Sequence, residues 1–211
     1  PGSVPSSNAI TISLIGPFKY SVFNATYPIS EPGRFTGNPV ELGMKFRTSV
    51  SGKVTGFRYY KGPGVSGLHI GHLWSKNGTM LAEATFTDES ASGWQTVMLS
   101  QPVSINVNET YTVSYFTASG DFVRHDPFFT QAVTNGFLRG LASGEDGGNG
   151  VYAYGSAPSF PADSYNSSNY YADVIFESDD NEAPYVTGTT PASASTNNQL
   201  NISISTSFNE T

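Results

Sequence analysis

The sequence predicts an all-β protein: an antiparallel β-sandwich of two sheets with a jelly-roll-like arrangement. Long stretches of helical periodicity are absent from the 211 residues. Short runs of alternating apolar and polar residues recur instead, and clusters of Gly, Pro, Asn and Asp separate them. Many short runs with hairpin-length connections are typical of sandwiches, because alternation gives each sheet one apolar face for the core.

The individual strands can be placed along the chain from this alternation. Asn77 and Gly78 are a strong signal for a two-residue hairpin turn between two of them. Pro102 lacks the N–H that a strand ladder needs, so we expect it at a strand end or a bulge. A loop-rich region with two short apolar pieces occupies residues 118–168. The predicted strands span residues 40–49, 53–61, 67–75, 79–87, 93–105, 109–117 and 169–178.

The composition changes near residue 177 and suggests a domain boundary. Residues 1–3, Pro-Gly-Ser, look like a vector scar, and residues 4–177 form the predicted sandwich. The acidic, proline-ended stretch 178–183 is the predicted linker. Residues 184–211 are rich in Ser and Thr and too few to bury a core of their own. We therefore expect them to be the truncated first strands of a second module.

Charge and composition narrow the classes of function. The net charge is −7 with only 10 Lys and Arg, so we expect no nucleic-acid partner. No long apolar run and no basic amphipathic segment occurs, so we expect no membrane insertion. The lack of cysteine removes disulfides, thiolate metal sites and cysteine nucleophiles. Asn-x-Ser/Thr sequons, at Asn24, Asn77, Asn108, Asn166, Asn201 and Asn209, suit an extracellular or cell-surface location.

Two parts of the sequence resemble known families. The stretches "VELGMKFRTSVSGKVTGFRYYKGPG", "GHLWSKNGTMLAEATFTDESASGWQTVMLSQPVSI", "ETYTVSYFTASG", "GNGVYAYG" and "NYYADVIF" are similar, in this order, to the DUF4082 family of bacterial extracellular domains. This resemblance covers residues 38–177, and residues 183–209 resemble the first strands of a bacterial Ig-like domain of the surface-layer type. The resemblances imply a secreted or cell-surface protein with neighbouring Ig-like domains, and they imply no reaction.

Two histidines lie three residues apart in "GLHIGHLWS", residues 67–75. Because side chains alternate along a strand, His69 shares a face with Leu73, whereas His72 shares the opposite face with Trp74. Side chains on opposite faces cannot close on one metal ion. We expect a structural role for His69. For His72 and Trp74, ligand contact and a purely structural role both stay open.

The sequence predicts no catalytic residues and no enzyme. No Gly-x-Ser-x-Gly elbow is present, and no serine is placed recognisably against a histidine and an acid. Asp121 and Asp126 could flank a glycosidic bond, as two carboxyls do in glycoside hydrolases. In an extended loop, however, they lie up to roughly 17 Å apart, so a solvated loop is the simpler interpretation. A glycan-active enzyme is therefore only a remote alternative.

Aromatic residues, which are well suited to ligand binding, are numerous, with 14 Phe, 12 Tyr and 2 Trp in the chain. Aromatic rings stack on the apolar faces of sugars, while polar side chains bind the hydroxyls at the rim. Outward strand positions and loops are the best candidates, and packing beneath a loop is the alternative for each aromatic. The candidate ligand-binding residues are Tyr60, His72, Trp74, Asp121, Phe122, Arg124, His125, Tyr152, Tyr154 and Tyr165.

A structural calcium ion is the one cofactor that the sequence suggests. Glu41 opens the first strand of the family resemblance and Asp173 lies in the last, so the two carboxylates could meet at one sheet edge. Asp146 and Asn149, in the glycine-rich "GEDGGNG", are a second candidate pair. The alternative is that these groups form ordinary ion pairs or accept backbone N–H groups.

Together these expectations describe a non-catalytic extracellular binding or adhesion module. A glycan or cell-surface polysaccharide is the favoured ligand, because aromatics are many and charges few. The alternative is a structural spacer or cap of a surface fibre that binds no small ligand.

Overall fold

The computed structural model describes residues 19–24, 26–27, 32–179, 186–192, 203 and 205–208. The chain divides into two compact units, Pro17–Asp180 on one hand and Pro1–Gly16 with Asn181–Thr211 on the other. The predicted sandwich, 4–177, and the first unit differ mainly at the N-terminus. The predicted vector scar and most of the predicted linker, 178–183, lie outside the described residues.

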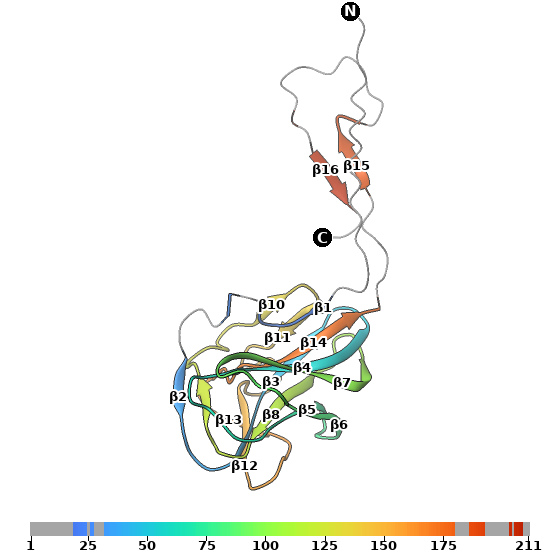
Figure 1. The fold of residues 1–211 in the computed structure, drawn as a ribbon. Helices are drawn as coiled ribbons and strands as arrows, with labels where there is room; N and C mark the ends of the chain where they lie inside the picture. Colours follow the sequence, from blue (N-terminus) through green and yellow to red (C-terminus); the bar gives the residue numbers. More distant parts are fainter. Residues whose placement is uncertain are drawn as a thin grey trace, which may run out of the picture. The chain divides into compact units, whose positions relative to one another are not determined.

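The first unit is an antiparallel β-sandwich, which confirms the predicted fold class (Figure 1). One sheet has the order β1-β14-β4-β7, made of Lys19–Tyr20, Ala172–Ser178, Gly52–Lys61 and Gly93–Ile105. The path of the other sheet is β10-β11-β3-β8-β5-β6, made of Val133–Asn135, Leu138–Gly140, Val40–Thr48, Tyr111–Thr117, His69–Ser75 and Met80–Thr85. This second sheet has eight strands, because β12 (Val151–Tyr154) pairs with β3 and with β13 (Asp163–Ser164).

Two smaller pairs of strands complete the described structure. β2 (Gly33–Phe35) pairs with β9 (Phe122–Arg124) in the first unit. In the second unit, β15 (Val186–Thr190) pairs with β16 (Ser205–Phe208). Two strands do not identify a family, so the Ig-like assignment stays a prediction. The described residues include no helix that is long and apolar enough to cross a lipid bilayer.

Each strand predicted from alternation is present, with bounds that differ by at most three residues. Pro102 falls where the pairing of β4 with β7 is irregular. The register jumps there from Val103 opposite Val54 to Met98 opposite Gly56. Proline cannot donate to the ladder, so the sequence places it where the ladder is broken.

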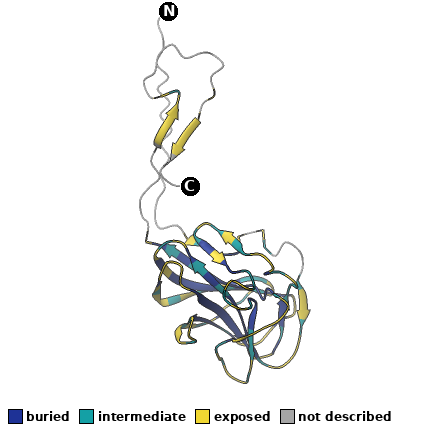
Figure 2. Ribbon diagram, turned by 180° about the vertical axis from the view of Figure 1, so that it is seen from behind, coloured by how far each residue is buried: buried dark blue, intermediate teal, exposed yellow. Residues whose placement is uncertain are grey.

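Aromatic side chains fill the space between the two sheets. Figure 2 shows that buried residues follow the long strands, while exposed residues lie mainly in the connections and small strands. Tyr59 of β4 stacks on Tyr115 of β8, with ring centroids 4.6 Å apart. The largest fully buried side chains are Tyr59, Tyr115, Tyr171, Phe23, Phe46, Phe57, Phe129, Phe176, Leu42, Met44, Leu73 and Ile105. Burying one such side chain stabilises the fold by roughly 1.5–3 kcal/mol.

The close approach of the two sheets can be tested at Gly71 of β5. A Cβ atom at Gly71 would lie 2.7 Å from Cδ2 of Phe57, on β4 of the opposite sheet. We expect Gly71→Ala to lower the free energy of unfolding by about 1–3 kcal/mol, because overpacking forces side chains and backbone to shift. Urea unfolding followed by tryptophan fluorescence measures the change. Gly37→Ala is the control, since a Cβ there meets nothing within 4 Å. Equal midpoints for both variants would contradict this packing.

Candidate functional site

His69 lies on the inner face of β5 and takes part in a buried polar network around Glu89. The Tyr59 hydroxyl donates to Glu89 Oε2 at 2.8 Å, and Lys61 Nζ donates to the same oxygen at 2.7 Å. His69 Nδ1 lies 2.9 Å from Glu89 Oε1 and 2.8 Å from the Tyr59 oxygen. Burial lowers the pKa of His69, against the opposing effect of Glu89. These contacts give His69 the structural role expected from its strand position.

His72 and Trp74 lie on the opposite face of β5, as alternation predicts, but both are buried. His72 contacts two carboxylates, with Nδ1 2.9 Å from Glu41 Oε1 and Nε2 3.3 Å from Glu83 Oε2. The ring of Phe160 packs edge-on against Trp74 at 5.8 Å. The connection between β12 and β13, which carries Phe160, therefore covers this part of the sheet. Of the two roles that the sequence left open for His72 and Trp74, this burial favours the structural one.

Several predicted ligand residues do come together around Arg124 of β9. Phe122 stacks on Phe35 of β2, with ring centroids 5.7 Å apart. The Arg124 guanidinium carbon lies 4.0 Å from the ring centre of Phe35 and 4.9 Å from that of Tyr165. Asp126 Oδ2 lies 2.8 Å from Arg124 Nε. We call Phe35, Phe122, Arg124 and Tyr165 the aromatic cluster. It holds a planar cation between two rings, with a carboxylate at its edge.

Exposed tyrosines accompany this cluster. Tyr165 is 51% exposed, and Tyr154 is 61% exposed. Tyr152 and Tyr154 share a face of β12, but their planes are inclined at 69° with centroids 5.6 Å apart. The two rings meet edge to face, so Tyr154 alone presents a strongly exposed ring here, and ligand contact by Tyr152 and Tyr154 stays a prediction. Tyr170 packs edge-on against Phe122 at 5.8 Å. β12 pairs with β13, which Tyr165 directly follows, so the chain joins β12 to the cluster there.

Other predicted ligand residues have packing partners instead. Tyr60 packs edge-on against Trp94, with ring centroids 5.8 Å apart. The ring centroids of Tyr60 and Tyr171 lie 6.0 Å apart. His125 Nδ1 lies 3.4 Å from the Tyr171 hydroxyl, and the His125 ring contacts Phe128. Tyr60 and His125 are thus part of the packing around Tyr171 rather than of the aromatic cluster.

The segment 121–126 is held by ion pairs rather than being a solvated loop, which corrects that expectation. Asp121 Oδ2 lies 3.3 Å from Arg34 Nη2, while Asp126 pairs with Arg124. The two carboxylates are therefore bound to different arginines. Phe122 is buried and stacks on Phe35, so the structure favours a packing role for this ring within the aromatic cluster over direct ligand contact.

The carboxylates of the first candidate calcium pair lie in different sheets. Glu41 is on β3 of the eight-stranded sheet, and Asp173 is on β14 of the four-stranded sheet. Asp173 pairs with Arg58 at 2.7 Å and accepts the N–H groups of Val22 and Phe23 at 2.8 and 3.2 Å. Burial raises the pKa of Asp173, and Arg58 opposes this rise. The prediction that Glu41 and Asp173 meet at one edge is wrong, because β3 and β14 do not pair.

The second candidate calcium pair also has protein partners. Asn149 Oδ1 accepts the Lys45 N–H at 2.8 Å, and its Nδ2 donates to the Leu141 carbonyl at 2.7 Å. Lys45 Nζ donates to the carbonyl oxygen of Asp146 at 2.7 Å. Among the described residues, no group of three or more His, Asp or Glu side chains is placed to hold a metal ion. Calcium binding stays a prediction without an assigned set of ligands.

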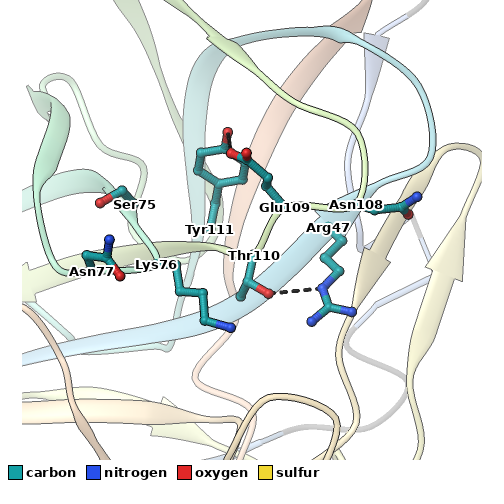
Figure 3. A pocket seen from close by; sticks show the side chains of 8 residues that line it. All are labelled: Arg47, Ser75, Lys76, Asn77, Asn108, Glu109, Thr110 and Tyr111. Carbon is teal, nitrogen blue, oxygen red and sulfur yellow. Dashed lines mark hydrogen bonds between the residues drawn. The ribbon is translucent and has the colours of Figure 1, made fainter.

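A pocket of about 420 Å³, which sequence reasoning missed, opens where β3, β5 and β8 meet two turns (Figure 3). Its lining is Arg47, Ser75, Lys76, Asn77, Asn108, Glu109, Thr110 and Tyr111, and we call it the charged pocket. In Figure 3 the Arg47 and Lys76 side chains flank Thr110, and both extend away from the Tyr111 ring. Alternation in β3 places Lys45 and Arg47 on one outward face, which is the signal that could have indicated a basic site.

Asp146 is the one carboxylate that the cations at this pocket share. Thr110 Oγ1 donates to Asp146 Oδ2 at 2.6 Å, Lys76 Nζ lies 2.9 Å away and Arg47 Nη2 lies 3.4 Å away. The hydrogen bond from Thr110, together with Lys76, lowers the pKa of Asp146 to about 2. The carboxylate is therefore ionised throughout the physiological range.

A comparison with known families agrees with the resemblance seen in the sequence. The family described as a domain of unknown function, DUF4082, matches residues 28–172. The chain belongs to the DUF4082 family. This match includes every residue of the aromatic cluster and of the charged pocket, so both lie within the DUF4082 domain. No curated protein matches the chain.

The bonds to Asp146 predict how the stability of the DUF4082 domain depends on pH. Its folded pKa is about 2, whereas an unfolded aspartate titrates at about 3.9. Because folding favours the ionised form, this contribution is complete above about pH 4 and is lost as pH falls toward 2. We expect Asp146→Asn to flatten the pH dependence of the unfolding free energy in this window. Urea unfolding at several pH values measures it, with exposed Asp163→Asn as control. An unchanged slope for Asp146→Asn would contradict the assigned bonds.

Proposed function

We propose that this DUF4082 domain is a non-catalytic carbohydrate-binding or adhesion module, and that the aromatic cluster with Tyr154 is its binding face. One observation carries the proposal: Tyr165 is half exposed while its ring also contacts the fixed guanidinium of Arg124. Tyr154 presents a second exposed ring on β12. Stacking surfaces and a charged hydrogen-bond donor thus occur together.

Sugars are well suited to such a face. A pyranose ring has an apolar C–H side that stacks on an aromatic ring and hydroxyl groups that require polar partners. Arg124 has five N–H donors, and its pair with Asp126 leaves several of them for a ligand. Tyrosine offers a large contact area at a low cost in conformational entropy.

The rigidity of the scaffold supports the same proposal. Arg124 belongs to β9, and β9 is paired with β2, so its backbone is fixed. Tyr165 directly follows β13, which pairs with β12 beside Tyr152. A binding group that is already held in place loses less entropy when a ligand binds.

We further propose that the protein acts outside the cell or at the cell surface, beside Ig-like domains. The Asn-x-Ser/Thr sequons at Asn24 and Asn166 have exposed asparagines that lie outside the lining of the charged pocket, which leaves them accessible to glycosylation. A polysaccharide of a cell surface is then the natural class of partner.

A glycan array with and without calcium tests the binding proposal. We expect binding to at least one glycan, and we expect Tyr154→Ala and Tyr165→Ala each to weaken it about tenfold, because each removes a stacking ring. Met98→Ala is the matched control, since Met98 is also exposed but lies on β7 of the four-stranded sheet. No binding across a broad array at high protein concentration would favour the structural spacer instead.

A further inference from the structure

We propose that the charged pocket is a second binding site, which takes the carboxylate or sulfate group of an acidic sugar. The inference rests on the proposed function only in that the ligand is a sugar. The residues that would bind it are different, since Tyr154 and Tyr165 are absent from the pocket lining. The recognition of the anionic group can therefore be tested separately.

The balance of charge at the pocket favours an anion. Arg47 and Lys76 share the Asp146 carboxylate, and Lys45 donates to the carbonyl oxygen of the same residue, so three cations gather around one acidic residue. Glu109 also lines the pocket, and one positive charge remains even when it is counted. This local excess occurs in a chain whose net charge is −7. A concentration of positive charge against that background attracts anionic ligands to this place.

Glu109 does not neutralise the cations of the pocket directly. Its Oε2 accepts the Tyr111 hydroxyl at 2.9 Å and the Asn106 side-chain N–H at 3.2 Å. Figure 3 shows its carboxylate beside the Tyr111 ring, whereas Arg47 and Lys76 extend toward the other side. The acidic and basic parts of the lining are thus separated.

Both cations at the pocket retain donors for a ligand. Arg47 Nε donates to Thr110 Oγ1 at 2.9 Å and its Nη2 lies 3.4 Å from Asp146, while Nη1 has no partner among the described residues. Lys76 has a 61% exposed side chain and gives one of its three N–H groups to Asp146. A guanidinium edge and an ammonium group on one side of a pocket match the oxygens of a carboxylate or sulfate.

The rest of the lining suits the hydroxyls of a sugar. Ser75, Asn77, Asn108 and Thr110 supply hydroxyl and carboxamide groups, which both donate and accept hydrogen bonds. Tyr111 is buried, so the pocket has no exposed aromatic face of its own. Recognition here depends on charge and hydrogen bonds, which favours a sugar that carries a negative group.

Two further hollows share lining residues with the charged pocket. A hollow of about 150 Å³ shares Lys76 and Thr110 with it, and another of about 310 Å³ shares Arg47 and Asn108. Small-molecule sites have volumes of roughly 300–1,000 Å³. A sugar chain whose anionic group binds Arg47 and Lys76 could therefore place neighbouring units at these adjoining hollows.

Calorimetric titration with an oligogalacturonate and with its fully methyl-esterified form tests the inference. The two probes have the same rings and differ only in charge, so we expect the ester to bind at least about tenfold more weakly. A sulfated and an unsulfated dextran oligosaccharide form the second arm, which distinguishes sulfate from carboxylate recognition. Affinity for the charged probe should also fall as NaCl rises, because salt screens exposed charges.

Single-charge variants locate the binding. We expect Lys76→Gln to weaken binding of the charged probe about fivefold, and Arg47→Lys, which keeps the charge but loses the planar fork, to weaken it as well. Lys53→Gln is the control, since Lys53 is exposed on β4 of the four-stranded sheet. Circular dichroism and the melting temperature verify that each variant is folded.

The outcomes separate this inference from the proposed function. Binding of acidic probes that survives Tyr154→Ala and Tyr165→Ala supports the charged pocket, even where no neutral glycan binds. Equal affinity for acid and ester, no binding of any acidic probe, or equal losses for Lys76→Gln and Lys53→Gln would each overturn it. Binding that depends on the two tyrosines and ignores Lys76 would assign acidic sugars to the aromatic cluster and overturn it too.

Discussion

The stacking of Tyr59 on Tyr115 across the sandwich is the contact on which much of the surrounding structure depends. One ring comes from β4 and the other from β8, so the pair joins the two sheets at their centre. Both hydroxyls are buried and require partners. Tyr59 donates to Glu89, in the connection between β6 and β7, and Tyr115 donates to the Tyr170 carbonyl just before β14. Burial raises the pKa of both tyrosines, so both stay neutral donors.

Glu89, which accepts the hydrogen bond from Tyr59, shows how the fold accommodates a charged group in its interior. Burial alone would raise the pKa of Glu89, but the hydrogen bonds from Lys61 and Tyr59 outweigh this effect and lower it. Asp173 and Arg58 form a comparable pair in the four-stranded sheet. Removing one member of such a pair leaves the other charge buried without a partner, so these contacts constrain the fold strongly. Only 13% of the residues are charged and several are used inside, so the cation excess at the charged pocket is an exception.

The strands and their faces follow from the sequence because alternation is a local property. The opposite directions of His69 and His72 could be predicted from neighbouring residues alone, and the structure has them so. What covers a face is not local. Phe160 lies far from Trp74 along the chain, and no sequence pattern near Trp74 predicts that the connection carrying Phe160 buries Trp74. The sequence therefore gives the direction of a side chain better than its exposure.

The candidate sites depend on contacts of still longer range, which is why only part of each site can be predicted from the sequence. Arg124 and Tyr165 could be named individually as loop aromatics and rim groups, but their contact requires β2, β9 and β13 to be in place. Chain order suggests that Glu41 and Asp173 meet at one edge, but the two residues belong to different sheets.

The charged pocket requires a connection of the chain to fold back onto β3. Asn149 fixes this connection through the Lys45 N–H, and Asp146 is thereby placed among the cations. Charge attraction in the pocket weakens with salt over a Debye length of about 8 Å at physiological ionic strength. Stacking on Tyr154 or Tyr165 has no comparable dependence, because it rests on the removal of apolar surface from water. The two proposed binding surfaces would therefore respond differently to ionic conditions, and ligands that carry charge and ligands that lack it would be sorted between them.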